Sequence, residues 1–291
     1  MEPTRPAAAN RVRDTIEELA GRLISRPLGA HGVITMRDPH VASLTYLAIP
    51  SETASFEKAP PLQGTFGGSS FLLADGKLRI EPNIHFPEIE QAREYVEQLL
   101  NSWQIDIALR FGDPELSFKY ETSEVIDRNP PPPGSPQTIQ VQSVAMATAV
   151  GNVTLHVSRG MYPEPPTVFR INPDVETLWQ RYQGYRRGHE PLPSMAYFSL
   201  TLLEAMAGGR AQAAKAFKIS PRVLAKIGQL TSERGDASTA RKYRALTSGG
   251  PLTGSEVHWI EEAVKVVIRR LGELDSIDTL STIELKDLPP L

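Results

Sequence analysis

Hydrophobic residues recur at two spacings along the chain and divide it into a mixed first half and a helical second half. Helical spacing over residues 11–26 predicts a first helix, which Pro27 ends. Short strand-like runs follow within residues 33–86. Asp75 and Gly76 separate two of these runs, and this pair of residues is a strong signal for a tight hairpin. The first half is therefore expected to begin with a helix followed by antiparallel strands.

The pattern from Pro87 onward predicts a second helix and then another hairpin. Residues 89–103 place their apolar side chains on one helical face, behind a proline at a first-turn position. From residue 105 to residue 111 apolar and polar residues alternate, and after a turn at 112–114 the alternation resumes. Alternation is typical of a half-buried strand, so we expect a helix followed by a β-hairpin.

Proline-rich segments mark the organisation of the middle of the chain. Five prolines fall within residues 129–136, which predicts an extended loop. A further hairpin is expected over residues 138–162, with its turn at Gly151 and Asn152. Residues 163–173 then hold four prolines, and the composition changes after them. This segment is the predicted domain boundary.

After the boundary the pattern is helical up to residue 276. Helix starts are expected beside four residues with capping side chains: Asn172, Ser194, Ser220 and Ser255. Gly208 and Gly209 are expected to end the helix that begins near Ser194. The tail, residues 277–291, alternates around Ile283 and Leu285 and is a candidate strand returning to the N-terminal sheet.

These elements predict an α+β fold, in which an N-terminal domain of antiparallel hairpins with two helices is followed by an all-helical C-terminal domain. The expected divisions are an α+β domain at 1–162 with a proline-rich loop at 129–136, a proline-rich linker at 163–173, a helical domain at 174–276 and a tail at 277–291.

Composition excludes several classes of site. The 291 residues contain no cysteine, which excludes disulfides, thiolate zinc sites, iron–sulfur clusters and a cysteine nucleophile. We find no phosphate-binding loop, dinucleotide fingerprint or nucleophile elbow, and the six histidines are dispersed, so no catalytic, cofactor-binding or metal-binding residue is predicted. No apolar run approaches a membrane span, and the first residues do not form a secretory signal. We expect a cytoplasmic protein without a membrane partner.

Charge is distributed unevenly along the chain. Residues 179–244 carry twelve Lys and Arg against four Asp and Glu, a net charge of +8, whereas the remaining residues sum to −11 and the chain to −3. Such segregation indicates an anionic partner, either nucleic acid or an acidic protein surface. The expected contact residues are Arg210, Lys215, Lys218, Arg222, Lys226, Arg234, Arg241, Lys242 and Arg244.

Residues 210–227 fit a helix-turn-helix pattern. Two small residues, Ala213 and Ala214, would lie where the helices cross, and Lys218 occupies the turn position that usually holds glycine. The positions expected to face a groove are Pro221, Arg222, Val223, Ala225 and Lys226. Of these only Arg222 and Lys226 could contact phosphate or a base edge, so sequence-specific recognition would be poor. The alternative is that two short helices packed at an angle in any bundle give this pattern.

The cations of residues 234–244 surround a predicted helix start near Ser238, where backbone N–H groups favour an anion. The alternative is a solvated loop in which Asp236 or Ser238 is an ordinary helix cap.

Residues 195–275 resemble HEPN-type helical bundles in the order of their helices and in a basic connection before a long final helix. In that family, ribonuclease activity resides in an Arg followed four to six residues later by a His. Neither His189 nor His258 has an Arg at that spacing, and the two pairs that do, Arg26 with His31 and Arg79 with His85, lie in the first half. The resemblance is therefore to the arrangement of helices, without the catalytic signature.

Three functions follow as hypotheses. The first is a non-enzymatic intracellular protein whose basic helical domain binds nucleic acid or an acidic protein. The second is a HEPN-type ribonuclease or its inactive relative, in which His189 and Arg187 would matter. The third is a structural module of a multi-subunit assembly, in which the acidic half of one copy meets the basic half of another to form a homo-oligomer.

Overall fold

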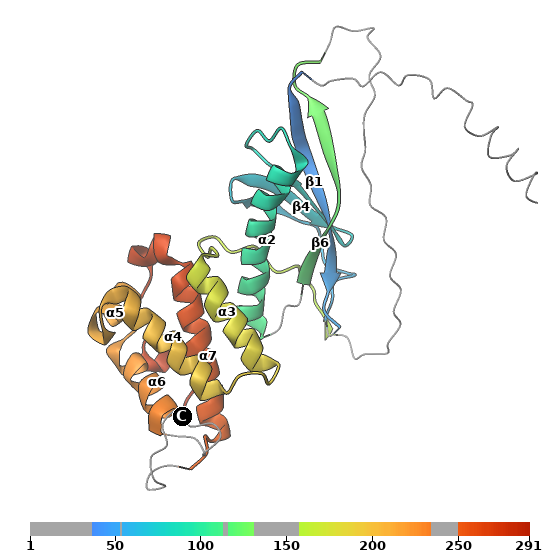
Figure 1. The fold of residues 1–291 in the computed structure, drawn as a ribbon. Helices are drawn as coiled ribbons and strands as arrows, with labels where there is room; N and C mark the ends of the chain where they lie inside the picture. The colour runs from blue at the N-terminus through green and yellow to red at the C-terminus, as the bar shows by residue number, and fades with distance from the viewer. Residues whose placement is uncertain (1–36, 53, 113–115, 131–156, 234–249) are drawn as a thin grey trace, which may run out of the picture.

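The computed structural model describes residues 37–52, 54–112, 116–130, 157–233 and 250–291. An antiparallel sheet with one long helix forms the N-terminal half, and a bundle of helices forms the rest (Figure 1). The expected helix at 11–26 and most of the hairpin at 138–162 lie outside the described residues. Among the helices described, none is both long enough and apolar enough to cross a membrane.

The main sheet has five strands in the order β3-β4-β5-β1-β6, and each neighbouring pair is antiparallel. The strands are β1 (Pro39–Pro50), β3 (Leu62–Phe66), β4 (Ser69–Ala74), β5 (Lys77–Glu81) and β6 (Leu116–Asp127). Two short strands, β2 (Ala54–Ser55) and β7 (Val157–Ser158), pair in parallel beside it. The predicted hairpin at Asp75 and Gly76 is confirmed, because these residues join β4 to β5 with φ angles of 50° and 71°.

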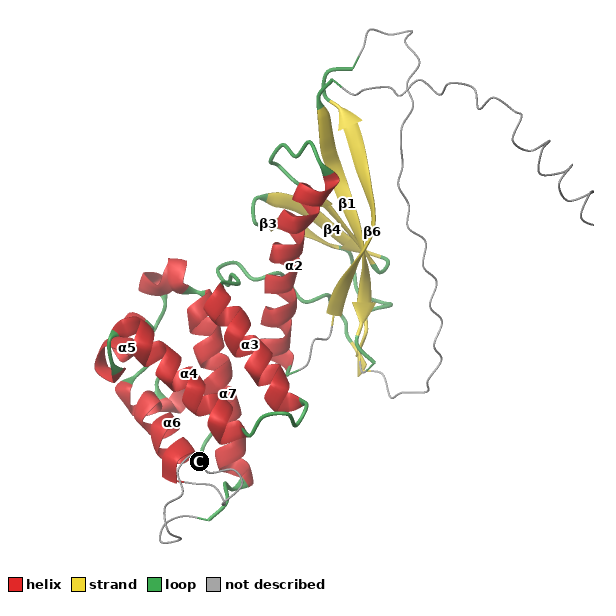
Figure 2. Ribbon diagram, viewed as in Figure 1, coloured by secondary structure: helices red, strands yellow, loops and turns green. Residues whose placement is uncertain are grey.

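Helix α2 (Ile89–Phe111) covers one face of the sheet and runs on to the bundle (Figure 2). The predicted strand at 105–111 is therefore wrong. Trp103 and Ile107 belong to the hydrophobic core of the sheet, whereas Ile105 and Leu109 belong to the core of the bundle. Residues two apart on a helix point in nearly opposite directions. A helix that is buried on two opposite faces thus shows the apolar alternation of a strand.

The helical half comprises α3 (Pro173–Arg186), α4 (Leu192–Ala207), α5 (Arg210–Ala216), α6 (Pro221–Glu233), α7 (Gly254–Gly272) and the short 3₁₀ helices η1 (Leu274–Thr279) and η2 (Leu285–Asp287). Asn172 caps α3 by accepting a hydrogen bond from the N–H of Val175, as expected. Helix α4 begins two residues before Ser194, and α7 is capped by Thr253 rather than by Ser255.

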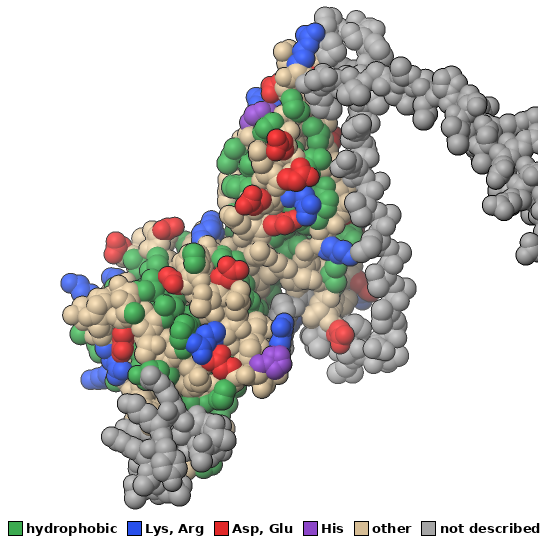
Figure 3. All heavy atoms as spheres, in the orientation of Figure 1, with side chains coloured by type: hydrophobic (Ala, Val, Ile, Leu, Met, Phe, Trp, Pro, Cys, Tyr) green, Lys and Arg blue, Asp and Glu red, His purple; other side chains and the backbone are tan. Residues whose placement is uncertain are grey.

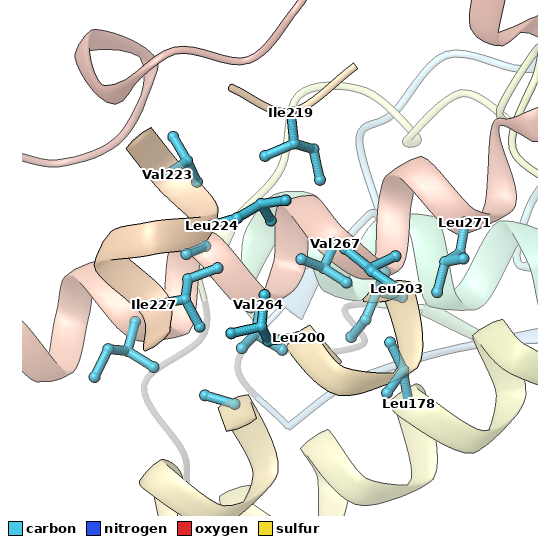
Figure 4. Packing of buried hydrophobic residues seen from close by; sticks show 14 of the residues in the cluster. Leu178, Leu200, Leu203, Ile219, Val223, Leu224, Ile227, Val264, Val267 and Leu271 are labelled. Atoms are coloured by element: carbon cyan, nitrogen blue, oxygen red, sulfur yellow. The ribbon is translucent and has the colours of Figure 1, made fainter. Parts of the chain in front are cut away.

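The core of the bundle lies where α4, α6 and α7 meet. Leu200 and Leu203 of α4, Leu224 of α6, and Val264 and Val267 of α7 are all fully buried (Figure 4). Their side chains converge from three separate helices. The bundle therefore has a hydrophobic core distinct from that of the sheet.

The proline-rich segment 163–173, expected as a linker, is tied to the helices on both sides of it. The Trp103 indole N–H donates to the carbonyl of Pro163 at 3.1 Å, and the N–H of Ile171 donates to Ser102 Oγ at 3.1 Å. At the other end, the N–H of Arg170 donates to the carbonyl of Gly272 at 2.7 Å. This connector therefore fastens α2 to the end of α7.

The tail does not return to the sheet. Ile283 instead forms a parallel bridge with Ile219, in which the N–H of Ile283 donates to Lys218 O at 2.8 Å and the N–H of Ser220 donates to Ile283 O at 2.9 Å. Leu288 is buried in the core of the bundle. The end of the chain thus packs on the helical half. Its backbone forms hydrogen bonds with backbone groups of the turn between α5 and α6.

Candidate anion-contacting surface

The turn between α5 and α6 has the local geometry that the sequence predicted. Lys218 has a φ of 50°, the left-handed conformation that glycine adopts most easily. Ala213 and Ala214, which were expected where the helices cross, are buried, and so are the larger apolar residues around the turn: Phe217, Ile219, Leu224 and Ile227. Small residues at the crossing let α5 and α6 approach closely, which fixes the cations on both helices relative to one another.

We expect Lys218→Gly to raise the free energy of unfolding by about 1 kcal/mol, because glycine adopts this φ without a steric penalty. Denaturant unfolding would measure the change. Lys215→Gly is the matched control, since Lys215 lies within α5 and the same change should cost about 1 kcal/mol there. A loss of stability from Lys218→Gly as large as that of the control would contradict a left-handed turn.

Five of the nine predicted contact residues lie on α5, the turn and α6. Lys215 and Arg222 are exposed, Lys218 is half-buried, and Lys226 donates a hydrogen bond to Gln229 at 3.2 Å. Arg210 is exposed and pairs with Glu204 of α4 at 2.6 Å. None of these five is neutralised by a described carboxylate of the N-terminal half. The other four predicted contacts lie outside the described residues: Arg234, Arg241, Lys242 and Arg244.

Blue side chains gather at the α5 end of the helical half in Figure 3, with single red side chains beside them. The sequence explains this excess of basic side chains, because no Asp or Glu occurs from residue 205 to residue 232. The nearest negative charges along the tail are Glu284 and Asp287, next to the bridge that Ile283 makes with the turn. The surface is therefore cationic over α5 and α6 and becomes mixed in charge towards the tail.

The prediction that Val223 faces a groove is wrong. Val223 is buried, because α6 turns this side chain into the core of the bundle. Pro221, Arg222 and Ala225 are exposed, and Lys226 is half-buried. The exposed start of α6 thus offers two cations and little else that could distinguish one base from another.

The described residues considered for ribonuclease activity lie outside α5 and α6. Arg187 and His189 are exposed in the connection between α3 and α4. Arg181 forms an ion pair with Glu190, and its guanidinium lies 3.9 Å from the centre of the Phe198 ring. Arg79 is hydrogen-bonded to Glu81 and Glu124 on the open face of the sheet. The N-terminal pair Arg26 and His31 lies outside the described residues.

A buried carboxylate on α2 escaped the sequence analysis. Asp106 lies 2.6 Å from Arg110 of the same helix and 3.7 Å from Arg269 of α7. Burial raises the pKa of Asp106, although both guanidinium groups act to lower it. The residue after Arg269, Arg270, pairs with Glu273 at 3.1 Å, and burial likewise raises the pKa of Glu273. The spacing of Asp106 and Arg110 would have been recognised only if this segment had been predicted as helix.

Two histidines that are distant in the sequence also lie close together. The rings of His40 and His85 have centroids 5.1 Å apart, and His85 Nε2 lies 3.4 Å from Asp38. Burial, and then the charge of His85, lower the pKa of His40. Within the described ranges, no group of three His, Asp or Glu side chains is placed to hold a metal ion.

The cations on α5 and α6 can contact an anion by charge and hydrogen bonding, and the described side chains around them include no nucleophile paired with a base. Comparison of the chain with protein-family models, with curated proteins and with solved structures finds no match. The chemistry of α5 and α6 is therefore the basis on which a function can be assigned.

Proposed function

We propose that this chain is a non-enzymatic cytoplasmic protein whose helical half, together with the end of α2, forms a separate domain and binds the phosphates of nucleic acid through α5, α6 and the turn between them. The observation that carries the proposal is the run of five cations within residues 210–226, unbroken by any acidic residue. Phosphate contacts of this kind release counterions and supply most of non-specific affinity.

The exposed cations are suited to a phosphate backbone. Lys215 and Arg222 extend from two different helices, and neither forms an ion pair with another described residue. Such side chains can approach a phosphate without first breaking an internal pair. Because Val223 is buried, α6 offers few contacts to base edges. The binding is therefore proposed to depend on charge rather than on base sequence.

The double variant Lys215→Gln, Arg222→Gln tests the proposal. Affinity for a short DNA duplex of mixed sequence is measured by fluorescence anisotropy across a salt series. The slope of log K against log salt should fall in magnitude by about 2, roughly one for each phosphate contact removed, and affinity should fall about ten-fold at low salt.

Lys58→Gln, Lys119→Gln is the matched control, because it removes the same charge from exposed positions of the N-terminal half. Its salt slope should stay that of the unaltered protein. Equal slopes for both double variants would exclude α5 and α6 as the contact surface. Absence of duplex binding at low salt would exclude nucleic acid as the partner and leave an acidic protein as the anion.

A further inference from the structure

We propose that the groove between α2 and α3 binds a free peptide of about five residues in an extended conformation. The groove encloses about 730 Å³, which lies within the range of roughly 300–1,000 Å³ that ligand sites occupy. It lies where the two halves of the protein meet and on different helices from the cations of α5 and α6. The inference is therefore independent of the proposed phosphate binding.

Side-chain amides line both walls of the groove. One wall is formed by three residues of α2 at regular spacing: Gln98, Asn101 and Gln104. The other is formed by residues of α3 and the residue that follows it: Glu176, Gln180, Gln183 and Arg187. Between the walls lie the apolar side chains of Ile105, Ile171 and Trp179. The two walls therefore contribute five carboxamides to the lining of a partly apolar hollow.

Most of these amides have hydrogen-bonding capacity left over. Gln104 accepts from the N–H of Phe118 at 3.1 Å and donates to Asn101 Oδ1 at 3.2 Å, which fixes both side chains. Among the described residues, the side chains of Gln98, Gln180 and Gln183 have no hydrogen-bond partner. A carboxamide combines N–H donors with a carbonyl acceptor, which is the same set of groups that a peptide bond presents. Amides on two facing walls thus match an extended main chain.

Opposite charges at the two ends of the α3 wall favour a peptide over a neutral ligand such as a sugar. Glu176 lies in the first turn of α3, and Arg187 follows its last residue. Eleven residues of helix separate them by about 16 Å. An extended peptide of about five residues has this length. Its ammonium group would lie near Glu176 and its carboxylate near Arg187.

Trp179 lines the groove, so its fluorescence can report binding there. The other two tryptophans, Trp103 and Trp259, are fully buried, whereas Trp179 is partly exposed. Penta-alanine with free termini is titrated into the full chain while tryptophan emission is recorded. The same peptide with acetylated and amidated ends, and the sugar maltotriose, are titrated in parallel. We expect a saturable change with free penta-alanine, several-fold weaker binding of the blocked peptide, and no change with maltotriose.

Substitutions of residues in the two walls test whether the peptide binds in the groove. Asn101→Leu and Gln180→Met should each weaken penta-alanine about five-fold, the effect of one lost hydrogen bond. Both side chains are exposed, and thermal unfolding confirms that the variants fold. Gln91→Met is the control, because Gln91 is exposed on α2 outside the groove. The proposal is overturned if free penta-alanine gives no saturable change, if maltotriose alone binds, or if the wall variants bind as tightly as the control.

Discussion

Trp103→Ala should lower the free energy of unfolding by about 3–5 kcal/mol, the range observed for removing a fully buried aromatic side chain. Trp103 is fully buried, and its ring lies against Phe66, Phe71 and Phe118 from three strands of the sheet. Its indole N–H also holds the connector at Pro163. The alanine variant therefore leaves a cavity and an unpaired carbonyl together.

Denaturant unfolding measures this loss. Phe111→Ala is the control, because Phe111 ends the same helix and is 47% exposed. A control change within about 0.5 kcal/mol is expected, as for most surface substitutions. A loss below about 1 kcal/mol for Trp103→Ala would mean that the aromatic cluster does not close the core of the sheet.

Gly272→Ala should cost about 3 kcal/mol, because the new methyl group has no room. A Cβ atom at Gly272 would lie 2.3 Å from the ring of Phe169 and 2.9 Å from the carbonyl oxygen of Arg170. Phe169 is buried, so its ring has little room to move aside, and the contact with Arg170 involves backbone. Glycine is thus the residue that lets the connector approach the end of α7.

A double-mutant cycle tests this explanation. Phe169→Ala should itself destabilise the protein, but it also removes the ring that the new methyl group would meet. The double variant should therefore be more stable than the sum of the two single effects, by about 1–2 kcal/mol. Gly254→Ala, at the start of the same helix, is the control, since a Cβ there meets nothing within 4 Å. Strictly additive effects would show that the ring and the methyl group do not compete for space.

Three features that depend on local chemistry were predicted from the sequence, whereas the caps expected at Ser194 and Ser255 were not found. The hairpin at Asp75 and Gly76, the cap at Asn172 and the left-handed position at Lys218 each depend on a few neighbouring residues. The strand predicted at 105–111 failed because its alternation comes from two hydrophobic cores, and a sequence does not display which distant elements will cover a helix.

The structure places five of the nine candidate contact residues, while their role in binding stays a prediction. Charge along the chain indicated α5 and α6, and five of the expected cations lie on these helices and their turn. The burial of Val223 was missed, because a short helix with apolar residues on neighbouring positions does not show which of them faces inward. The contact between Asp106 and Arg269 joins residues far apart in the sequence, so no local pattern could have indicated it.

Helix α2 packs in both hydrophobic cores, and this determines where the chain can be divided into fragments. Helix α2 contributes Trp103 to the sheet and Leu109 to the bundle, so the boundary between the halves runs along this helix and not across the connector. A fragment beginning at residue 163 would lack the part of α2 that packs in the core of the bundle. The apolar side chains that α2 covers would then be exposed to water. A truncated gene that keeps the cationic helices intact must therefore also encode α2, and point variants are a safer means than deletion for testing the role of these helices.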